Sequence, residues 1–186
     1  YIIRVFEWNG MSSLDPYKMV VRFTHDPSEC NDNLEDAYPI ENGQILTGYS
    51  GGPNVSTGVK DVDYYSFYVP RPGVFDLNIF RKDTFQYQIT VFNPDKKQVI
   101  LTNYYTNGID TWNDHSLCDV GIHTIELIDR TSEECGKRKN KFTQYQLQLQ
   151  NKYPDDQECN NTYASATSVF GNETIYAALA SLMDTD

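Results

Sequence analysis

The chain contains no long hydrophobic run and is poor in basic residues. No apolar segment approaches the roughly 20 residues of a membrane-spanning helix, so insertion into a membrane is not expected. Among its 186 residues, 26 acidic side chains outnumber 15 basic ones, giving a formal net charge of −11. Nucleic-acid binding requires clustered Lys and Arg, so no nucleic-acid partner is expected. The charge is compatible with a bound cation, although surplus carboxylates also keep a secreted surface soluble.

The motifs of common catalytic sites are also missing. The chain contains neither HExxH nor GxSxG, and its three histidines are His25, His115 and His123. His123 shares strand parity with Ile125 and Leu127, which predicts a core or edge position for its ring. Three carboxylates near His115 are interpreted as an acidic loop: Asp110, Asp114 and Asp119. The chain is therefore predicted not to be an enzyme.

Cysteines are few, and no CxxC spacing occurs among the four: Cys30, Cys118, Cys135 and Cys159. This spacing argues against a zinc cluster, and the even number favours disulfides formed in an oxidising, extracellular compartment. Two pairing schemes remain open. Cys118 would staple a hairpin by bonding to Cys135, or Cys30 would pair with Cys118 and leave Cys135 for Cys159.

Three N-glycosylation sequons point to the same compartment. They begin at Asn54, Asn160 and Asn172. A secreted or cell-surface glycoprotein is expected.

An internal repeat sets the domain organisation. Glu29-Cys30-Asn31-Asp32-Asn33 returns as Glu158-Cys159-Asn160-Asn161-Thr162, at an offset of 129 residues. Asp61-Val62-Asp63 returns as Asp184-Thr185-Asp186, and the shorter offset fits an insertion within residues 49–58. Such self-similarity indicates repeated structural units. Residues 1–25 are predicted to be the C-terminal strands of a preceding repeat, 26–153 a complete repeat, and 154–186 the N-terminal part of a following repeat.

Apolar residues alternate with polar ones through the complete unit, as in half-buried strands. The clearest example sets Tyr145, Leu147 and Leu149 against intervening glutamines. Other strands are expected at Ile45–Tyr49, Asp63–Val69, Phe75–Ile79, Tyr87–Val91, Val99–Leu101 and Ile125–Leu127. Turns are expected at Pro70–Gly73, Asn93–Asp95 and Asn107–Gly108. Seven or eight such strands predict an all-β fold, an antiparallel two-sheet β-sandwich of jelly-roll-like form.

The order of these motifs resembles the bacterial pre-peptidase C-terminal (PPC) domain family. The opening segment is Glu29–Asp32, followed by the Gly-containing strand Ile45–Gly48 and by Asp61-Val62-Asp63-Tyr64-Tyr65-Ser66-Phe67. A Pro72-Gly73 turn and the closing strand Tyr145–Leu149 complete the pattern. The resemblance implies a jelly-roll-like sandwich, appended to secreted enzymes or strung in arrays on surface proteins. Many family members lack cysteines, so no pairing is implied.

Calcium is the expected cofactor, because it prefers six to eight oxygen ligands, several from carboxylates. The oxygen-bearing candidates in the complete unit are Glu29, Asn31, Asp32, Asp61 and Asp63. In similar collagen-binding modules of clostridial collagenases, the matching segments close around the metal. A second, weaker site is expected at Glu158, Asn160, Asn161, Asp184 and Asp186. Alternatively, Asp61 and Asp63 cap a turn, and Asn31 and Asp32 make local backbone hydrogen bonds.

Three aromatic residues form a candidate ligand platform: Tyr104, Tyr105 and Trp112. They are expected in a loop-like stretch, where they would stack on a sugar ring or cover the end of the sandwich.

Two functional hypotheses follow. The chain is a structural or adhesive repeat of an extracellular filament or surface array, with neighbouring repeats as partners and self-assembly into a fibre. Alternatively, it is an accessory module that holds a secreted hydrolase on a glycan or on collagen.

Overall fold

The computed structural model describes residues 18–20, 26–50, 61–81, 87–104, 109–130, 143–153, 159–160, 164 and 166–176. Nine strands and one short 3₁₀ helix form in these residues. They are η1 (Leu34–Asp36), β1 (Tyr38–Pro39), β2 (Ile45–Ser50), β3 (Val62–Val69), β4 (Gly73–Arg81), β5 (Tyr87–Phe92), β6 (Gln98–Tyr104), β7 (Ile109–Leu117), β8 (Gly121–Asp129) and β9 (Thr143–Lys152). No helix in the described ranges is long and apolar enough to cross a bilayer.

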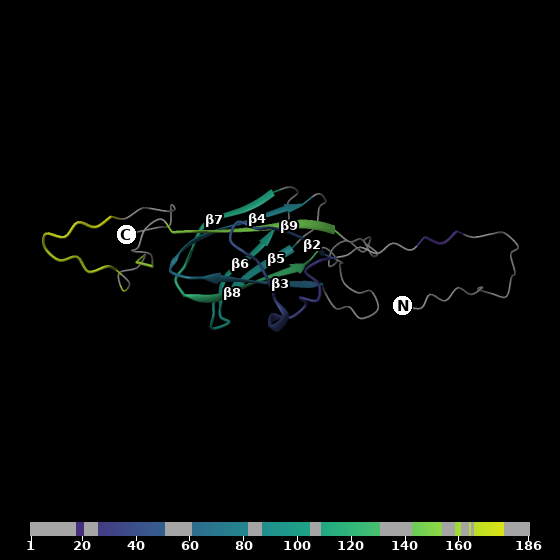
Figure 1. Cartoon of the computed structure of the whole chain (residues 1–186), viewed down its shortest axis with the longest axis horizontal. Coiled ribbons are helices and arrows are strands. Elements are labelled where there is room, and N and C mark those ends of the chain that lie inside the picture. Colours follow the sequence, from purple (N-terminus) through teal and green to yellow (C-terminus); the bar gives the residue numbers. More distant parts are fainter. Residues whose placement is uncertain are drawn as a thin grey trace, which may run out of the picture.

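The strands build two sheets that lie face to face as two layers (Figure 1). The five-stranded sheet has the order β1-β3-β8-β5-β6, and the four-stranded sheet has the order β2-β9-β4-β7. Every pair is antiparallel except β1 with β3, where Tyr38 lies beside Tyr65 in parallel register. The predicted all-β sandwich is therefore confirmed.

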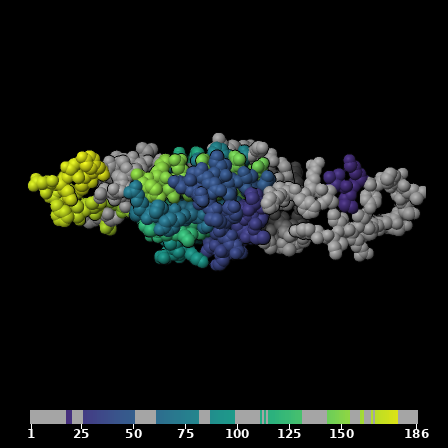
Figure 2. Space-filling view, viewed as in Figure 1, coloured from purple at the N-terminus to yellow at the C-terminus, as the bar shows by residue number. Residues whose placement is uncertain are grey.

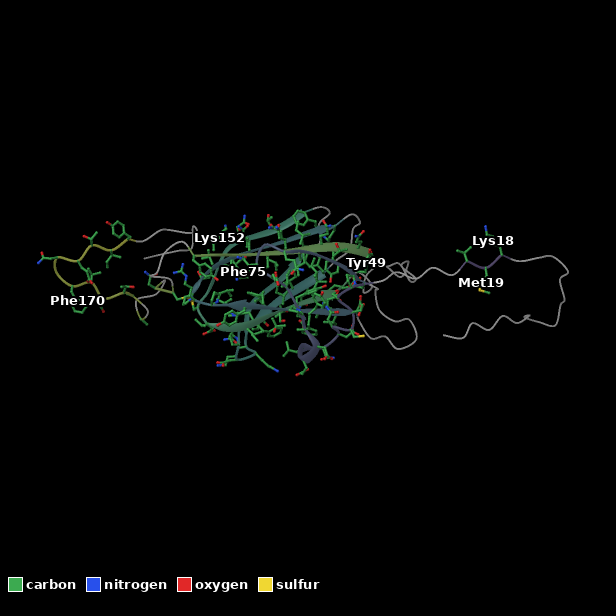
Figure 3. All side chains as sticks on the ribbon, viewed as in Figure 1. Lys18, Met19, Tyr49, Phe75, Lys152 and Phe170 are labelled. Atoms are coloured by element: carbon green, nitrogen blue, oxygen red, sulfur yellow. A yellow bond between two sulfur atoms is a disulfide. The ribbon has the colours of Figure 1, made fainter. Side chains whose placement is uncertain are left out.

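The core lies between the sheets and follows the predicted alternation. Tyr145, Leu147 and Leu149 of β9 are completely buried, and their neighbours on β9 face outward. Phe75 of β4 lies between the two layers (Figure 3). His123 is also in the core, as its parity predicted, and its ring stacks on Phe67 at 5.5 Å between centroids. Burial lowers the pKa of His123, so the ring is neutral at physiological pH.

One part of the predicted secondary structure is wrong, and some strands extend beyond their predicted bounds. Asp110 and Asp114, expected with His115 in an acidic loop, belong to strand β7, the edge strand of the four-stranded sheet, paired with β4. Asp119 does lie outside the strands, in the turn between β7 and β8. Strand β6 runs to Tyr104 and is longer than the predicted Val99–Leu101. Strand β7 was missed because polar residues occupy both of its faces, so no apolar alternation marks it.

The chain enters and leaves the sandwich at opposite ends. The described residues 18–20 lie beyond one end, and residues 166–176 lie beyond the other (Figures 1 and 2). Tyr49 and Lys152 mark these two ends of the four-stranded sheet (Figure 3). The sheet register agrees, since Ser50 pairs with the first residue of β9 and Lys152 is its last.

Candidate functional site

Carboxylates gather where the opening segment meets the start of β3. The backbone amide of Tyr64 donates to the Asn31 carbonyl at 2.9 Å, and the Asn31 side-chain amide donates to the Tyr64 carbonyl at 3.1 Å. These two bonds fix the opening segment beside β3. We name the resulting group the acidic cluster; its members are Asp26, Glu29, Asn31, Asp32, Asp61 and Asp63. Four of the predicted metal ligands, Glu29, Asp32, Asp61 and Asp63, are near enough to influence one another electrostatically within this cluster, and Asp26 lies near them.

Two buried oxygens of the acidic cluster have no hydrogen-bond partner. Asn31 is 0% exposed and Asp63 is 1% exposed. The Oδ1 atom of each accepts no hydrogen bond. Leaving a buried acceptor unpaired costs about 1–3 kcal/mol. These are oxygens of the kind that calcium binds, and Glu29 and Asp32 of the same cluster are exposed.

Negative charge is concentrated in this cluster. Burial raises the pKa of Asp63 to about 8, a hydrogen bond from Tyr145 opposes the rise, and Asp61, Asp26 and Glu29 add to it. Burial together with Asp61, Asp32 and Asp26 raises the pKa of Glu29 to about 6. A bound cation would relieve the repulsion that causes part of both shifts.

A chain of buried hydrogen bonds connects the cluster to the core. The Tyr145 hydroxyl donates to Asp63 Oδ2 at 2.6 Å and lies 2.5 Å from the Tyr65 hydroxyl. Tyr65 Oη is 3.4 Å from Ser28 Oγ, which donates to Asp26 Oδ1 at 2.6 Å. We name this chain the tyrosine relay. Burial, followed by the nearby Asp63 charge, raises the pKa of both tyrosines, so both hydroxyls stay protonated.

The relay was not predicted from the sequence. Alternation placed Tyr65 and Tyr145 in the core, and a buried tyrosine hydroxyl needs a polar partner. That requirement was the available signal that a polar group lies inside the sandwich.

The residues of the acidic cluster carry oxygen ligands of the kind that calcium prefers, but their side chains do not surround one point. Among the described residues, no three His, Cys, Asp or Glu side chains converge on one point as metal ligands. Two possible ligand oxygens, Asn31 Oδ1 and Asp63 Oδ1, are buried and have no hydrogen-bond partner. Glu29 and Asp32 are exposed, so their side chains are at the surface, where they can turn toward an ion. Both oxygens of Asp26 already accept hydrogen bonds, from Ser28 and from the Tyr49 amide.

The second predicted metal site lies mostly outside the described residues. Glu158, Asn161, Asp184 and Asp186 fall in undescribed stretches, and Asn160 is described. Asn160 is 6% exposed, and its Oδ1 atom has no hydrogen-bond partner, like that of its repeat counterpart Asn31. Cys159 has a φ of 75°, a left-handed conformation that Cys30 does not adopt. The two openings therefore share the buried asparagine but differ in backbone at the cysteine.

The disulfide joins Cys118 to Cys159, with Cα atoms 5.4 Å apart. Both pairing schemes considered from the sequence gave Cys118 a different partner and are wrong on that point. Cys118 precedes β8, whereas the loop containing Cys135 follows β8. Cys30 is an exposed free thiol, and Cys135 lies outside the described residues.

The two described residues of the predicted aromatic platform do not lie in a loop. Tyr104 is the last residue of β6 and Trp112 belongs to β7, in different sheets, while Tyr105 lies outside the described residues. Tyr104 and Trp112 therefore do not share one loop surface.

Among the glycosylation candidates, Asn172 is exposed, Asn160 is buried, and Asn54 lies outside the described residues. Asn172 is therefore the accessible acceptor of the two that are described.

No family model and no curated protein matches the chain. Similar solved structures include the pre-peptidase C-terminal domain of a Bacillus anthracis collagenase, with 13% identity over 61% of this chain and 94% of that chain, TM-score 0.44. They also include PliG of Aeromonas hydrophila, a periplasmic inhibitor of g-type lysozyme, with 13% identity over 62% and 96%, TM-score 0.42. A family 6 carbohydrate-binding module matches at 10% identity over 62% and 98%, TM-score 0.33. The first of these is a domain of the family that the sequence motifs resemble.

Proposed function

We propose that the chain is a non-catalytic, extracellular structural repeat whose fold is stabilised by calcium bound at the acidic cluster. The observation that carries the proposal is the pair of buried, unpaired oxygens on Asn31 and Asp63. Calcium supplies the positive partner that these oxygens lack. The ligands are Glu29, Asn31, Asp32, Asp61 and Asp63, with water completing the six to eight oxygens that calcium requires.

Calcium at this position ties the opening segment to the sandwich. The segment is held to β3 by the two Asn31–Tyr64 bonds, while Glu29 and Asp32 are at the surface. An ion shared between this segment and Asp61–Asp63 would fix the entry of the chain into the domain. Asp26 acts as a supporting residue because its oxygens already accept bonds from Ser28 and Tyr49.

The repeat role is supported by the geometry of the ends. The chain enters at the end marked by Tyr49 and leaves at the end marked by Lys152 (Figure 3). Units whose entry and exit lie at opposite ends can follow one another in a line, as stacked repeats do. Neighbouring repeats are the proposed partners, within an extracellular filament or adhesive surface array.

Calcium is expected to raise the thermal unfolding temperature of the whole chain. Extracellular calcium modules bind with dissociation constants of about 10⁻⁴–10⁻³ M. Saturation at about 10 mM calcium then raises the unfolding temperature by roughly 5–10 °C relative to a chelator. Differential scanning calorimetry measures this, with equal magnesium as the control for ionic strength. Equal unfolding temperatures in calcium and in chelator would contradict the proposal.

A second function, binding of a neutral polysaccharide, is favoured by the outer face of the four-stranded sheet. Gln144, Gln146, Gln148 and Gln150 alternate on this face of β9. The register places Thr47 and Phe80 beside Gln146. A cavity of about 130 Å³ is lined by Phe80, Arg81, Gln144, Tyr145 and Gln146. An aromatic ring flanked by amides provides the stacking surface and the orienting hydrogen bonds that sugar sites use.

Phe80→Ala and Gln146→Ala are expected to abolish retention of the chain on the polysaccharide that the wild type binds. Affinity electrophoresis through a panel of neutral polysaccharides measures this retention. Thr124→Ala, on the outer face of the other sheet, is the control and should be retained like the wild type. Retention on collagen alone, or on no polysaccharide, would exclude this second function.

A further inference from the structure

The disulfide crosses the boundary between two units of the proposed tandem array, on which this inference rests. Cys118 lies between β7 and β8 of the complete unit. Cys159 belongs to the repeated opening Glu158–Asn160, the counterpart of Glu29–Asn31. The bridge therefore connects the turn of one unit to the opening of the next, across a sequence separation of 41 residues.

The chain is also held to the same end of the sandwich just before it leaves. The Arg71 guanidinium lies 4.7 Å from the centre of the Tyr153 ring. A Cβ atom at Gly73 would lie 2.7 Å from Tyr153 Cδ1 and 2.5 Å from the Lys152 carbonyl oxygen. Lys152 itself pairs with Asp76 at 2.6 Å. The exit is therefore packed directly on the start of β4, at a position that only glycine can occupy without displacing it.

The residue that follows the disulfide-bonded cysteine is buried. Asn160, next to Cys159, is 6% exposed, although it lies seven residues beyond Tyr153. Only residues 154–158 separate Tyr153 from the disulfide-bonded Cys159. Such a connection spans at most about 20 Å. Both of its ends are attached to one end of the domain.

We infer that the Cys118–Cys159 disulfide is a covalent staple between consecutive units, and that the β7–β8 turn is the attachment point for the next unit's opening segment, beside the exit that the Arg71–Gly73 turn holds. Forming the bridge joins the two Sγ atoms and passes two protons and two electrons to a disulfide donor of the oxidising compartment. The staple adds a second covalent connection between one unit and the next, beside the five residues that join them along the chain.

The opening segment is also the proposed calcium-binding segment of each unit. Glu158 and Asn160 flank the bridged cysteine, as Glu29 and Asn31 flank Cys30. The staple therefore holds the segment on which the next unit's ion depends.

The test compares the oxidised whole chain with the Cys118→Ser/Cys159→Ser variant. Disulfide mapping of the non-reduced wild type should give a Cys118–Cys159 peptide. Residues 154–158 contain Asp155, Asp156 and Glu158, which are cleavage sites for an Asp/Glu-specific protease. We expect cleavage within 154–158 to become roughly tenfold faster in the variant, because local opening next to position 159 is no longer opposed by the bond to Cys118.

Cys30→Ser is the matched control and should be cleaved at the wild-type rate, since it removes a free thiol. Mild reduction of the wild type makes the same comparison without a substitution, should the double variant fold poorly. Unchanged cleavage after loss of the bridge, or a different partner for Cys118, would overturn the inference. The calcium response of the same samples tests the proposed function separately. If the Cys118–Cys159 peptide is found and the bond slows cleavage, but calcium does not stabilise the chain, the calcium proposal is wrong and the staple stands.

Discussion

Replacing Asp63 by asparagine should stabilise the chain in a chelator at alkaline pH and destabilise it in calcium. Asp63 is buried and its pKa is raised to about 8, from an ordinary value of 3.8. Without a cation, the folded state therefore binds a proton that the unfolded state releases above pH 4. This contribution to stability is complete below about pH 4 and is lost, at up to about 1.4 kcal/mol per pH unit, as the pH rises to about 8.

The Asp63→Asn substitution removes this pH-dependent loss of stability, because asparagine does not ionise. Its amide oxygen can still accept the bond from Tyr145, and its amide group can donate to the surrounding carboxylates. In calcium the effect reverses, since the variant lacks one negatively charged ligand. The same side chain thus weakens the metal-free fold and strengthens the metal-bound fold.

Urea unfolding at pH 5 and pH 8.5, in chelator and in about 10 mM calcium, measures both effects. Asp95→Asn is the control, because Asp95 is exposed and pairs only with Lys97 in the described hydrogen bonds and ion pairs. A variant less stable than the wild type in all four conditions would assign Asp63 a purely structural role. A variant that keeps the full calcium response would remove Asp63 from the ligand set.

The fold was predictable because its core strands keep one face apolar. Tyr145, Leu147 and Leu149 alternate with glutamines in the sequence, and all three are completely buried. Strand β7 carries no such pattern: Thr111, Asn113 and Ser116 are exposed. It is a strand because β4 pairs with it along the edge of the sheet, with a bulge between Phe75 and Leu77. Pairing with a distant strand is information that local alternation does not contain.

The acidic cluster could be predicted in part from the sequence. Its oxygen-rich segments are visible in the sequence, and the two Asn31–Tyr64 bonds bring them together. The tyrosine relay was not predictable, because Tyr65 and Tyr145 belong to different sheets. Alternation places each ring in the core without indicating that the two hydroxyls meet. The partner of Cys118 was also not predictable, because local sequence patterns do not show that the chain returns Cys159 to the turn between β7 and β8.

The close approach of the two tyrosines explains why β2 has a glycine at position 48. It also predicts that a side chain at this position would strongly destabilise the fold. A Cβ atom on Gly48 would lie 2.4 Å from Tyr145 Cζ, 2.5 Å from its hydroxyl oxygen and 2.8 Å from the Tyr65 hydroxyl. Both rings are 0% exposed, so neither can move toward solvent. Gly48→Ala must therefore displace packed aromatic rings, and we expect a loss of about 3 kcal/mol, which lowers the unfolding temperature by roughly 10 °C.

The same substitution should also weaken the calcium response, since moving Tyr145 breaks its bond to Asp63. Calorimetry of Gly48→Ala in calcium and in chelator measures both effects in one experiment. Thr47→Ala, the adjacent position on the opposite face of β2, is the control and should change the unfolding temperature little. If Gly48→Ala unfolded at the wild-type temperature, the two hydroxyls would not be held over position 48. If it lost stability but kept the full calcium response, the position of Asp63 would not depend on the relay, and the cluster would be held by the opening segment alone.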